Sequence, residues 1–91
     1  RADVRCFLAE DHSERACAPD GEILLSQSLK DLAAEVKGRF LRVHRNALVA
    51  KAHISRLLRA DDGWLLELAD VRERPAVSRR HLSEIKAEIT G

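Results

Sequence analysis

The sequence predicts a mainly β domain, built from short antiparallel strands with two helices. Three observations support this fold class. Short apolar runs alternate with turn sequences, two separate stretches repeat their apolar residues at helical spacing, and 91 residues are enough for only one domain. Hydrophobic residues make up 45% of the chain, which is enough for a modest packed core.

The first part of the chain predicts two strands and a hairpin. Residues 4–8, VRCFL, have the apolar run of a buried strand, whereas residues 9–15, AEDHSER, are polar enough to form a loop. The sequence PDGE at 19–22 favours a turn and leads into a short strand, ILL at 23–25. We therefore expect a hairpin with His12 near one end.

A first helix of about ten residues is predicted after Ser28. Ser28 is a favourable N-cap, and Gly38 stands where a left-handed C-cap belongs. Between these two residues the apolar side chains recur at helical spacing. They are expected to face the core: Leu29, Leu32, Ala33 and Val36.

The middle of the chain predicts four further strand segments. Residues 40–43 and 48–54 have strand patterns on either side of the break HRNA. Residues 54–60 and 64–70 flank the turn sequence DDG, which predicts a hairpin. Trp64 beside this turn is expected to be a packing residue rather than a stacking platform.

A second helix is predicted after Pro75, with Ser78 as its N-cap and one apolar face formed by Leu82, Ile85 and Ile89. Arg79 and Arg80 then fall in the first turn, where the helix dipole disfavours cations. Either these arginines point into solvent, or an external anion such as a phosphate binds them together with the free N–H groups of the helix start.

The net charge of +1 conceals a segregation of charge along the chain. Residues 1–38 hold five Lys/Arg against eight Asp/Glu, whereas residues 39–91 hold eleven against seven. Residues 39–59 contain six Lys/Arg and no acidic residue. Such a block forms either a solvated face or an anion-binding surface.

Composition and motifs favour a cytoplasmic protein without catalytic machinery. No stretch approaches the ~20 apolar residues of a membrane span, and the N-terminus lacks the apolar segment of a signal peptide. Cys6 and Cys17 are expected to be reduced thiols, with a disulfide as the alternative. The histidines are too far apart in sequence for a local metal motif, and phosphate loops and nucleophile motifs are absent. We expect no enzyme activity, metal or cofactor.

The segment RVHRNA at residues 42–47 favours an anion-binding or base-reading turn. Arginine can read guanine through two parallel hydrogen bonds and asparagine can read adenine, provided that an exposed turn presents them. Arg45 and Asn46 are candidates for this role, with a solvated loop as the alternative. We expect His44 to brace the turn through a hydrogen bond rather than to contact a base.

The pattern RFLRVHRNALVAKAHI at 39–54, a hairpin, and VSRRHLSEI at 77–85 resemble the LytTR family of DNA-binding domains. These domains are output modules of many bacterial response regulators. The chain is most similar to the alginate-regulator-like subgroup with HRNALVA, and the resemblance runs from about Val4 to Ile89. It implies an elongated, mainly β fold of small antiparallel sheets in tandem, whose loops enter successive major grooves of a bent duplex.

The resemblance also implies roles for individual residues. The base-reading positions of the family fall on Arg45 and Arg80, and a third contact, from the first loop, falls on His12. Residues expected to contact the DNA backbone or to support the contacts are Arg42, Asn46, Lys51 and Arg79. Lys51→Ala is expected to weaken specific and random binding alike and to lower the salt dependence by about one unit.

Three departures from the family pattern accompany this resemblance. The family normally begins with one or two further strands, so we expect residues 1–91 to form a single LytTR-like domain lacking them. The first loop here is HSERACA, without the aromatic residue common in the family, and Ala50 replaces an asparagine found in many members.

The expected partner is double-stranded DNA with repeated half-sites, bound by a homodimer of the domain. The resemblance also allows an N-terminal receiver domain in the full-length protein, and no membrane partner is expected. The alternative function is a protein-interaction module whose basic surface docks an acidic partner.

Overall fold

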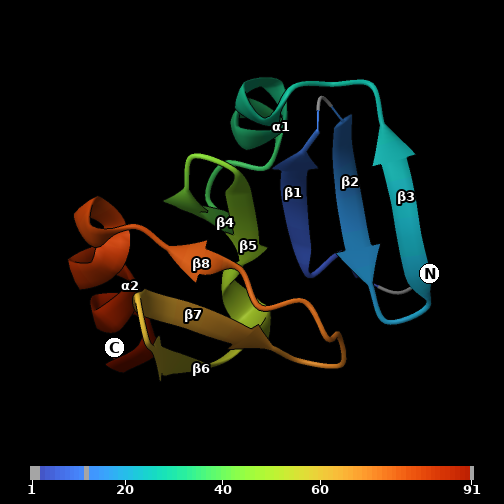
Figure 1. The fold of residues 1–91 in the computed structure, drawn as a ribbon. Helices are drawn as coiled ribbons and strands as arrows, with labels where there is room; N and C mark the ends of the chain where they lie inside the picture. The colour runs from blue at the N-terminus through green and yellow to red at the C-terminus, as the bar shows by residue number, and fades with distance from the viewer. Residues whose placement is uncertain (1–2, 12, 91) are drawn as a thin grey trace.

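The computed structural model describes residues 3–11 and 13–90 (Figure 1). The strands are β1 (Cys6–Glu10), β2 (Ser13–Ala18), β3 (Gly21–Leu25), β4 (Phe40–His44), β5 (Ala47–Ala50), β6 (Ile54–Ala60), β7 (Gly63–Leu68) and β8 (Ala76–Val77). The helices are α1 (Leu29–Glu35), the 3₁₀ helix η1 (Lys51–His53) and α2 (Arg79–Thr90). A five-stranded sheet has the order β3-β2-β1-β5-β4, and a three-stranded sheet has the order β6-β7-β8. Every pairing within these sheets is antiparallel, which confirms the predicted fold class.

The β1–β2 hairpin is longer than the sequence predicts. The stretch expected to be a loop, residues 9–15, belongs largely to the two strands, because β1 reaches Glu10 and β2 begins at Ser13. Glu10 pairs with Ser13 in the ladder, and the Ser13 hydroxyl donates a hydrogen bond to the Glu10 carbonyl at 3.0 Å. The prediction was wrong because it rested on polarity, whereas backbone pairing holds polar residues equally well in a solvated hairpin end.

Helix α1 begins as predicted. The Ser28 hydroxyl accepts a hydrogen bond from the Asp31 amide at 3.2 Å, as an N-cap does. The helix ends at Glu35, so its seven residues are fewer than expected, and Gly38 follows with φ of +94°. That angle lies in the region that favours glycine. The buried residues Leu29 and Leu32 pack with Phe7, Ala16 and Leu48 of the five-stranded sheet.

The five-stranded sheet buries both of its faces around β1 and β5. Side chains alternate across a strand, so Phe7 and Leu48 face α1 while their neighbours face the other way. On that second face, β7, β8 and α2 complete the main core. Its buried members include Cys6, Leu8, Val43, Val49, Leu66, Leu68, Val77 and Ile85. Burial on both faces explains why all four residues of β5 are buried.

The chain turns between the two sheets at η1. The sequence predicts one strand over residues 48–54, but β5 ends at Ala50 and the next three residues form the 3₁₀ helix. The reason is topological, because β6 belongs to the other sheet and the chain must change direction to reach it. The β6–β7 hairpin forms as predicted, with Gly63 at φ +155° after the turn. Trp64 packs against the main core, which confirms its packing role.

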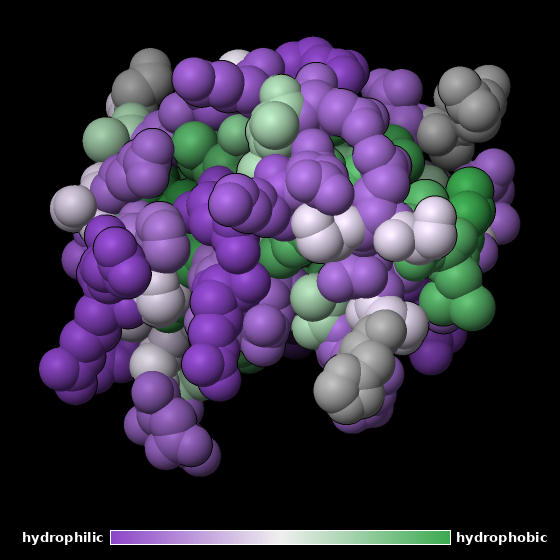
Figure 2. All heavy atoms as spheres, turned by 90° about the horizontal axis from the view of Figure 1, so that it is seen from above, coloured by the Kyte–Doolittle hydropathy of each residue, from purple (hydrophilic) through white to green (hydrophobic). Residues whose placement is uncertain are grey.

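The molecule is only slightly longer than it is wide. Its principal extents are 31 × 27 × 24 Å, so the elongation that we expected is not present. At one side of the five-stranded sheet, the edge strand β3 leaves Ile23 and Leu24 61% and 73% exposed. Figure 2, seen from above the view of Figure 1, shows a hydrophobic patch on the right, the side where β3 lies, and hydrophilic side chains over most of the remaining surface. None of the described helices has the length and apolar character to cross a membrane.

Candidate nucleic-acid interface

The β4–β5 turn is held by side chains from its own hairpin. The Arg42 guanidinium donates from Nε to the His44 carbonyl at 3.0 Å and from Nη2 to the Arg45 carbonyl at 2.8 Å. The Asn46 amide donates to Nδ1 of His44 at 3.2 Å. This bond confirms that His44 braces the turn, and it requires Nδ1 to be unprotonated.

These bonds leave two side chains free to act at the tip of the turn. Arg45 and Asn46 are exposed, whereas Arg42 is half-buried. Both predicted contact residues of the turn are therefore presented to solvent by a backbone whose carbonyl and amide groups already have partners. The same bonds give Arg42 a supporting place, because its fork of N–H groups is directed at the turn.

The start of α2 is fastened to the end of β4. The Ser78 amide donates to the Val43 carbonyl at 2.8 Å, which places the first turn of the helix beside the β4–β5 turn (Figure 1). Arg79 and Arg80 are the first two residues of the helix, as predicted, and both are exposed. The first turn holds no acidic residue. Two cations and the positive end of the helix dipole therefore share one small region.

Ser78 does not cap α2 in the way that the sequence predicts. Its carbonyl accepts the His81 amide at 3.0 Å, while its hydroxyl pairs with Nδ1 of His81 at 2.5 Å. The half-buried imidazole competes successfully for the hydroxyl that would otherwise accept a helix N–H.

The charges around His81 link the two elements. Burial, followed by the charge of Arg80, lowers the pKa of His81; the carboxylate of Glu84 opposes this shift, and the charge of Arg42 adds to it. Arg42, beside the turn, and Arg80, at the helix start, therefore both act on one imidazole, in keeping with the hydrogen bond that joins Ser78 to Val43. A neutral His81 is the form compatible with this concentration of cations.

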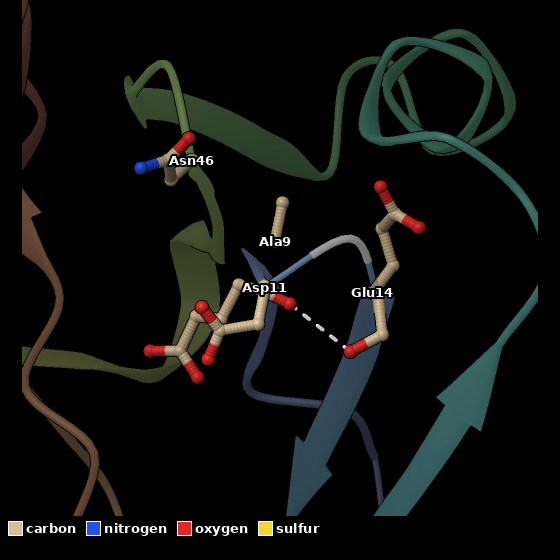
Figure 3. Close-up of a pocket in the computed structure, with 6 residues that line it drawn as sticks. Ala9, Asp11, Glu14 and Asn46 are labelled. Atoms are coloured by element: carbon tan, nitrogen blue, oxygen red, sulfur yellow. Dashed lines mark hydrogen bonds between the residues drawn. The ribbon is translucent and has the colours of Figure 1, made fainter.

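The end of the β1–β2 hairpin adjoins the β4–β5 turn. The Ala9 amide donates to the Asn46 carbonyl at 2.9 Å, and a shallow hollow of about 630 Å³ lies between the two hairpin ends. Figure 3 shows Asn46 on one side of this hollow and Asp11 and Glu14 on the other. Its lining comprises Ala9, Glu10, Asp11, Ser13, Glu14 and Asn46. Sequence reasoning missed this acidic neighbour, although the run EDHSE could have indicated it.

The structure therefore assembles most of the predicted contact residues on one side of the molecule. Arg45 and Asn46 of the turn lie near Arg79 and Arg80 of α2. Lys51 is separate, because it follows the far end of β5 and lines a different groove together with Arg39. His12 lies outside the described residues, so its expected base contact stays a prediction.

One cluster elsewhere has ligands that could suit a metal ion. Among the described residues, the ligand atoms of Cys17, Glu22 and Glu73 lie within 4.8 Å of one another. The Arg15 guanidinium already pairs with Glu22 at 2.5 Å and with Glu73 at 3.3 Å. The cluster is thus neutralised by an internal cation.

Cys17 faces Cys6 across β1 and β2, and both are free thiols. Their hydrogen bond lowers the pKa of Cys17 and, together with burial, raises that of Cys6.

Comparison with known proteins identifies the family of this fold and turn. The protein-family model of the LytTr DNA-binding domain matches residues 2–90 of this chain. The chain belongs to this family. The LytTR domain described here is 38% identical over 86 residues to the positive alginate biosynthesis regulatory protein of Pseudomonas aeruginosa, covering 92% of this chain. It spans 35% of the length of that relative.

A solved structure also matches the LytTR domain. It is the LytTr DNA-binding domain of a putative methyl-accepting/DNA response regulator from Bacillus cereus, with a TM-score of 0.80. The match covers 97% of this chain and 82% of the other at 23% identity. At that identity the likeness establishes the fold, with its two antiparallel sheets and two helices.

Proposed function

We propose that this LytTR domain is the sequence-specific DNA-binding output domain of a bacterial transcriptional regulator of the response-regulator type. The observation that carries the proposal is the presentation of two exposed arginines, Arg45 and Arg80, by adjoining elements whose backbones are tied together. Family membership supports DNA as the ligand. The printed name of the Pseudomonas relative supports a regulatory role.

In this proposal the β4–β5 turn and the start of α2 enter the major groove. Arg45 and Arg80 each donate two hydrogen bonds to the edge of a guanine, and Asn46 supports the reading of a neighbouring base. Arg79 neutralises a phosphate, aided by the free N–H groups at the helix start. Lys51 lies beyond the far end of β5, away from the turn, so its expected contact with the DNA backbone stays a prediction.

The acidic hollow restricts how a duplex can lie on this side. Glu10 is paired with Arg15 at 3.1 Å, but Asp11 and Glu14 repel phosphates, so the DNA backbone must avoid the end of the β1–β2 hairpin. Carboxylates can instead accept a hydrogen bond from the amino group of cytosine in the major groove. This hairpin end therefore suits the floor of a groove and not its phosphate rim.

The finer parts of the proposal concern assembly. A net charge of +1 gives weak non-specific attraction to DNA. We therefore infer that tight binding uses two copies on repeated half-sites. We also propose that the full-length regulator is cytoplasmic and that an N-terminal receiver domain controls the pairing of the two copies. A stable one-to-one complex on a single half-site near 0.15 M salt would contradict the two-copy arrangement.

The experiment that tests the function is selection of bound duplexes from a random pool near 0.15 M salt. Recovery of a repeated short motif is expected, and Arg45→Ala and Arg80→Ala should each relax one position within it. A folded domain that recovers no motif would refute sequence-specific reading. That outcome would favour the interaction module, in which the same cations dock an acidic protein.

A further inference from the structure

Trp64 carries two cations on its indole ring. The Cζ atom of Arg59 lies 4.9 Å from the ring centroid, and the Nζ atom of Lys86 lies 5.1 Å from it. Both cationic residues are exposed, whereas Trp64 is half-buried against the main core. The ring thus anchors two charged groups, from β6 and from α2, at one place on the surface.

Neither charge of this pair has a carboxylate partner among the residues that the structure describes. Within residues 3–11 and 13–90, Arg59 and Lys86 take part in no ion pair, even though Asp61 and Asp62 follow Arg59 closely in the chain. Arg56, on the same strand, does pair with Glu67 at 2.6 Å. Both cations on the ring are therefore available to external anions.

Helix geometry aligns this pair with the proposed DNA interface. Lys86 follows Arg79 by seven residues, or almost two turns, so the two side chains share one flank of α2 about 10 Å apart. The acidic residues Glu84 and Glu88 project roughly 140° and 180° around the helix from Arg79. This flank therefore carries cations from its first turn onward, while the acids of the helix lie on another side.

Strand register places Arg59 beside the same flank. Arg59 pairs with Trp64 across the β6–β7 hairpin, and Trp64 pairs with Val77, just before α2 begins. We call Arg59 and Lys86 the flank pair. An axial distance of about 10 Å corresponds to about three base pairs of duplex. A duplex that follows this flank of α2 from Arg79 needs to continue only that far to reach Lys86.

We propose that the flank pair binds backbone phosphates of the DNA that adjoins the base-reading site. The inference rests on the proposed function and extends it, because it adds a contact that carries no sequence information and governs the salt dependence of binding. Trp64 acts as the platform that holds both cations ready, and it does not itself touch the DNA.

The test compares the salt dependence of binding by the domain and its variants. Affinity for the selected site with long flanks is measured from 50 to 200 mM salt for Arg59→Gln, Lys86→Gln and the double variant. The double variant is expected to lower the slope of log K against log salt by about one to two units, since each phosphate contact contributes about 0.9. Arg72→Gln is the matched control, because Arg72 is exposed on the β7–β8 connection, which extends away from α2 (Figure 1).

A second comparison uses duplexes trimmed on either side of the site. Removing the DNA that lies over α2 should erase the difference in salt slope between the native domain and the double variant. Removing the DNA on the other side of the site should preserve that difference. Equal slopes for the double variant and Arg72→Gln, with equal melting temperatures, would overturn the inference. If Arg80→Ala still lost its sequence preference in that experiment, the proposed function would stand without the flank pair. If no duplex were preferred, the salt slope on random DNA would still test whether the flank pair binds phosphates: a lower slope for the double variant would support it, and an unchanged slope would contradict it.

Discussion

Replacement of Arg42 separates two roles that a cation beside a DNA-binding turn can have. In the structure, Nε and Nη2 of Arg42 donate to the carbonyls of His44 and Arg45 at 3.0 and 2.8 Å. If Arg42 positions the turn, the loss of these bonds should loosen the presentation of Arg45. If it neutralises a phosphate, the loss of its charge should matter instead.

The size of the positioning effect follows from the two bonds. A hydrogen bond from a charged donor contributes about 1.5–3 kcal/mol when it is buried. Arg42 is half-buried, so competition from water lowers this to about 1 kcal/mol per bond. Loss of both bonds costs about 2 kcal/mol. The cost lowers the free energy of unfolding if the turn is ordered in the free domain, or it weakens binding if the turn must become ordered on the DNA. The second case corresponds to a roughly thirtyfold loss of affinity for the specific site.

The assay measures affinity for the selected duplex and for a scrambled duplex at several salt concentrations. Arg42→Gln and Arg42→Lys should both lose specific affinity, because an ammonium group cannot reproduce the planar fork that reaches two carbonyls. Neither variant should change the salt slope. The positioning argument would be refuted if Arg42→Lys bound like the native domain while Arg42→Gln lowered the slope by about 0.9, as expected for loss of a phosphate contact.

Three further predictions follow from single side chains. Arg5→Met should destabilise the fold by about 3 kcal/mol in urea denaturation, because the buried guanidinium donates to the carbonyls of Ala69 and Asp3 at 2.9 and 2.8 Å; an unchanged midpoint would contradict this. The pKa of His81 is lowered from 6.5 in the folded protein, so its contribution to stability is present above pH 6.5 and is lost as the pH falls below it. The His81→Gln variant should accordingly lose less stability than the native domain between pH 7 and 5. Arg80→Ala should cost ~1–3 kcal/mol on the selected duplex and almost nothing on random DNA, and equal losses on both would remove its base-reading role.

The elements that sequence reasoning predicted well are those with local determinants. Ser28 caps α1 through its own helix, and the DDG turn closes the β6–β7 hairpin between adjacent segments. Arg79 and Arg80 could be placed in a first helical turn because Pro75 and the apolar spacing fix where that helix starts. In each case the residues that decide the structure lie within a few positions of it.

The features that could not be predicted depend on side-chain orientations that the sequence pattern does not fix, even where the partners are only two or three residues apart. The fork of Arg42 finds its carbonyls only because the two residues of the turn fold back toward β4. The Ser78 hydroxyl binds a histidine ring that the packing of α2 brings within reach. Lys51 and Arg45 belong to the same sequence motif. They nevertheless stand at opposite ends of β5, a strand of four residues. Proximity in a motif therefore does not by itself place two residues in one cluster.

The distribution of paired and unpaired cations reconciles the small net charge with DNA binding. Cations with carboxylate partners at the described positions are committed to the fold: Arg5, Arg15, Arg56 and Arg74. Five acids are partners in these pairs at the described positions, namely Glu10, Glu22, Glu67, Asp70 and Glu73, and Asp11 and Glu14 lie beside Glu10 at one hairpin end. The exposed arginines at the β4–β5 turn and the start of α2 take part in none of these pairs. What a duplex meets there is a local excess of positive charge, bounded on one side by acids. Such a surface attracts phosphates in one orientation and rejects them in another, so it favours a defined docking of DNA over non-specific adhesion.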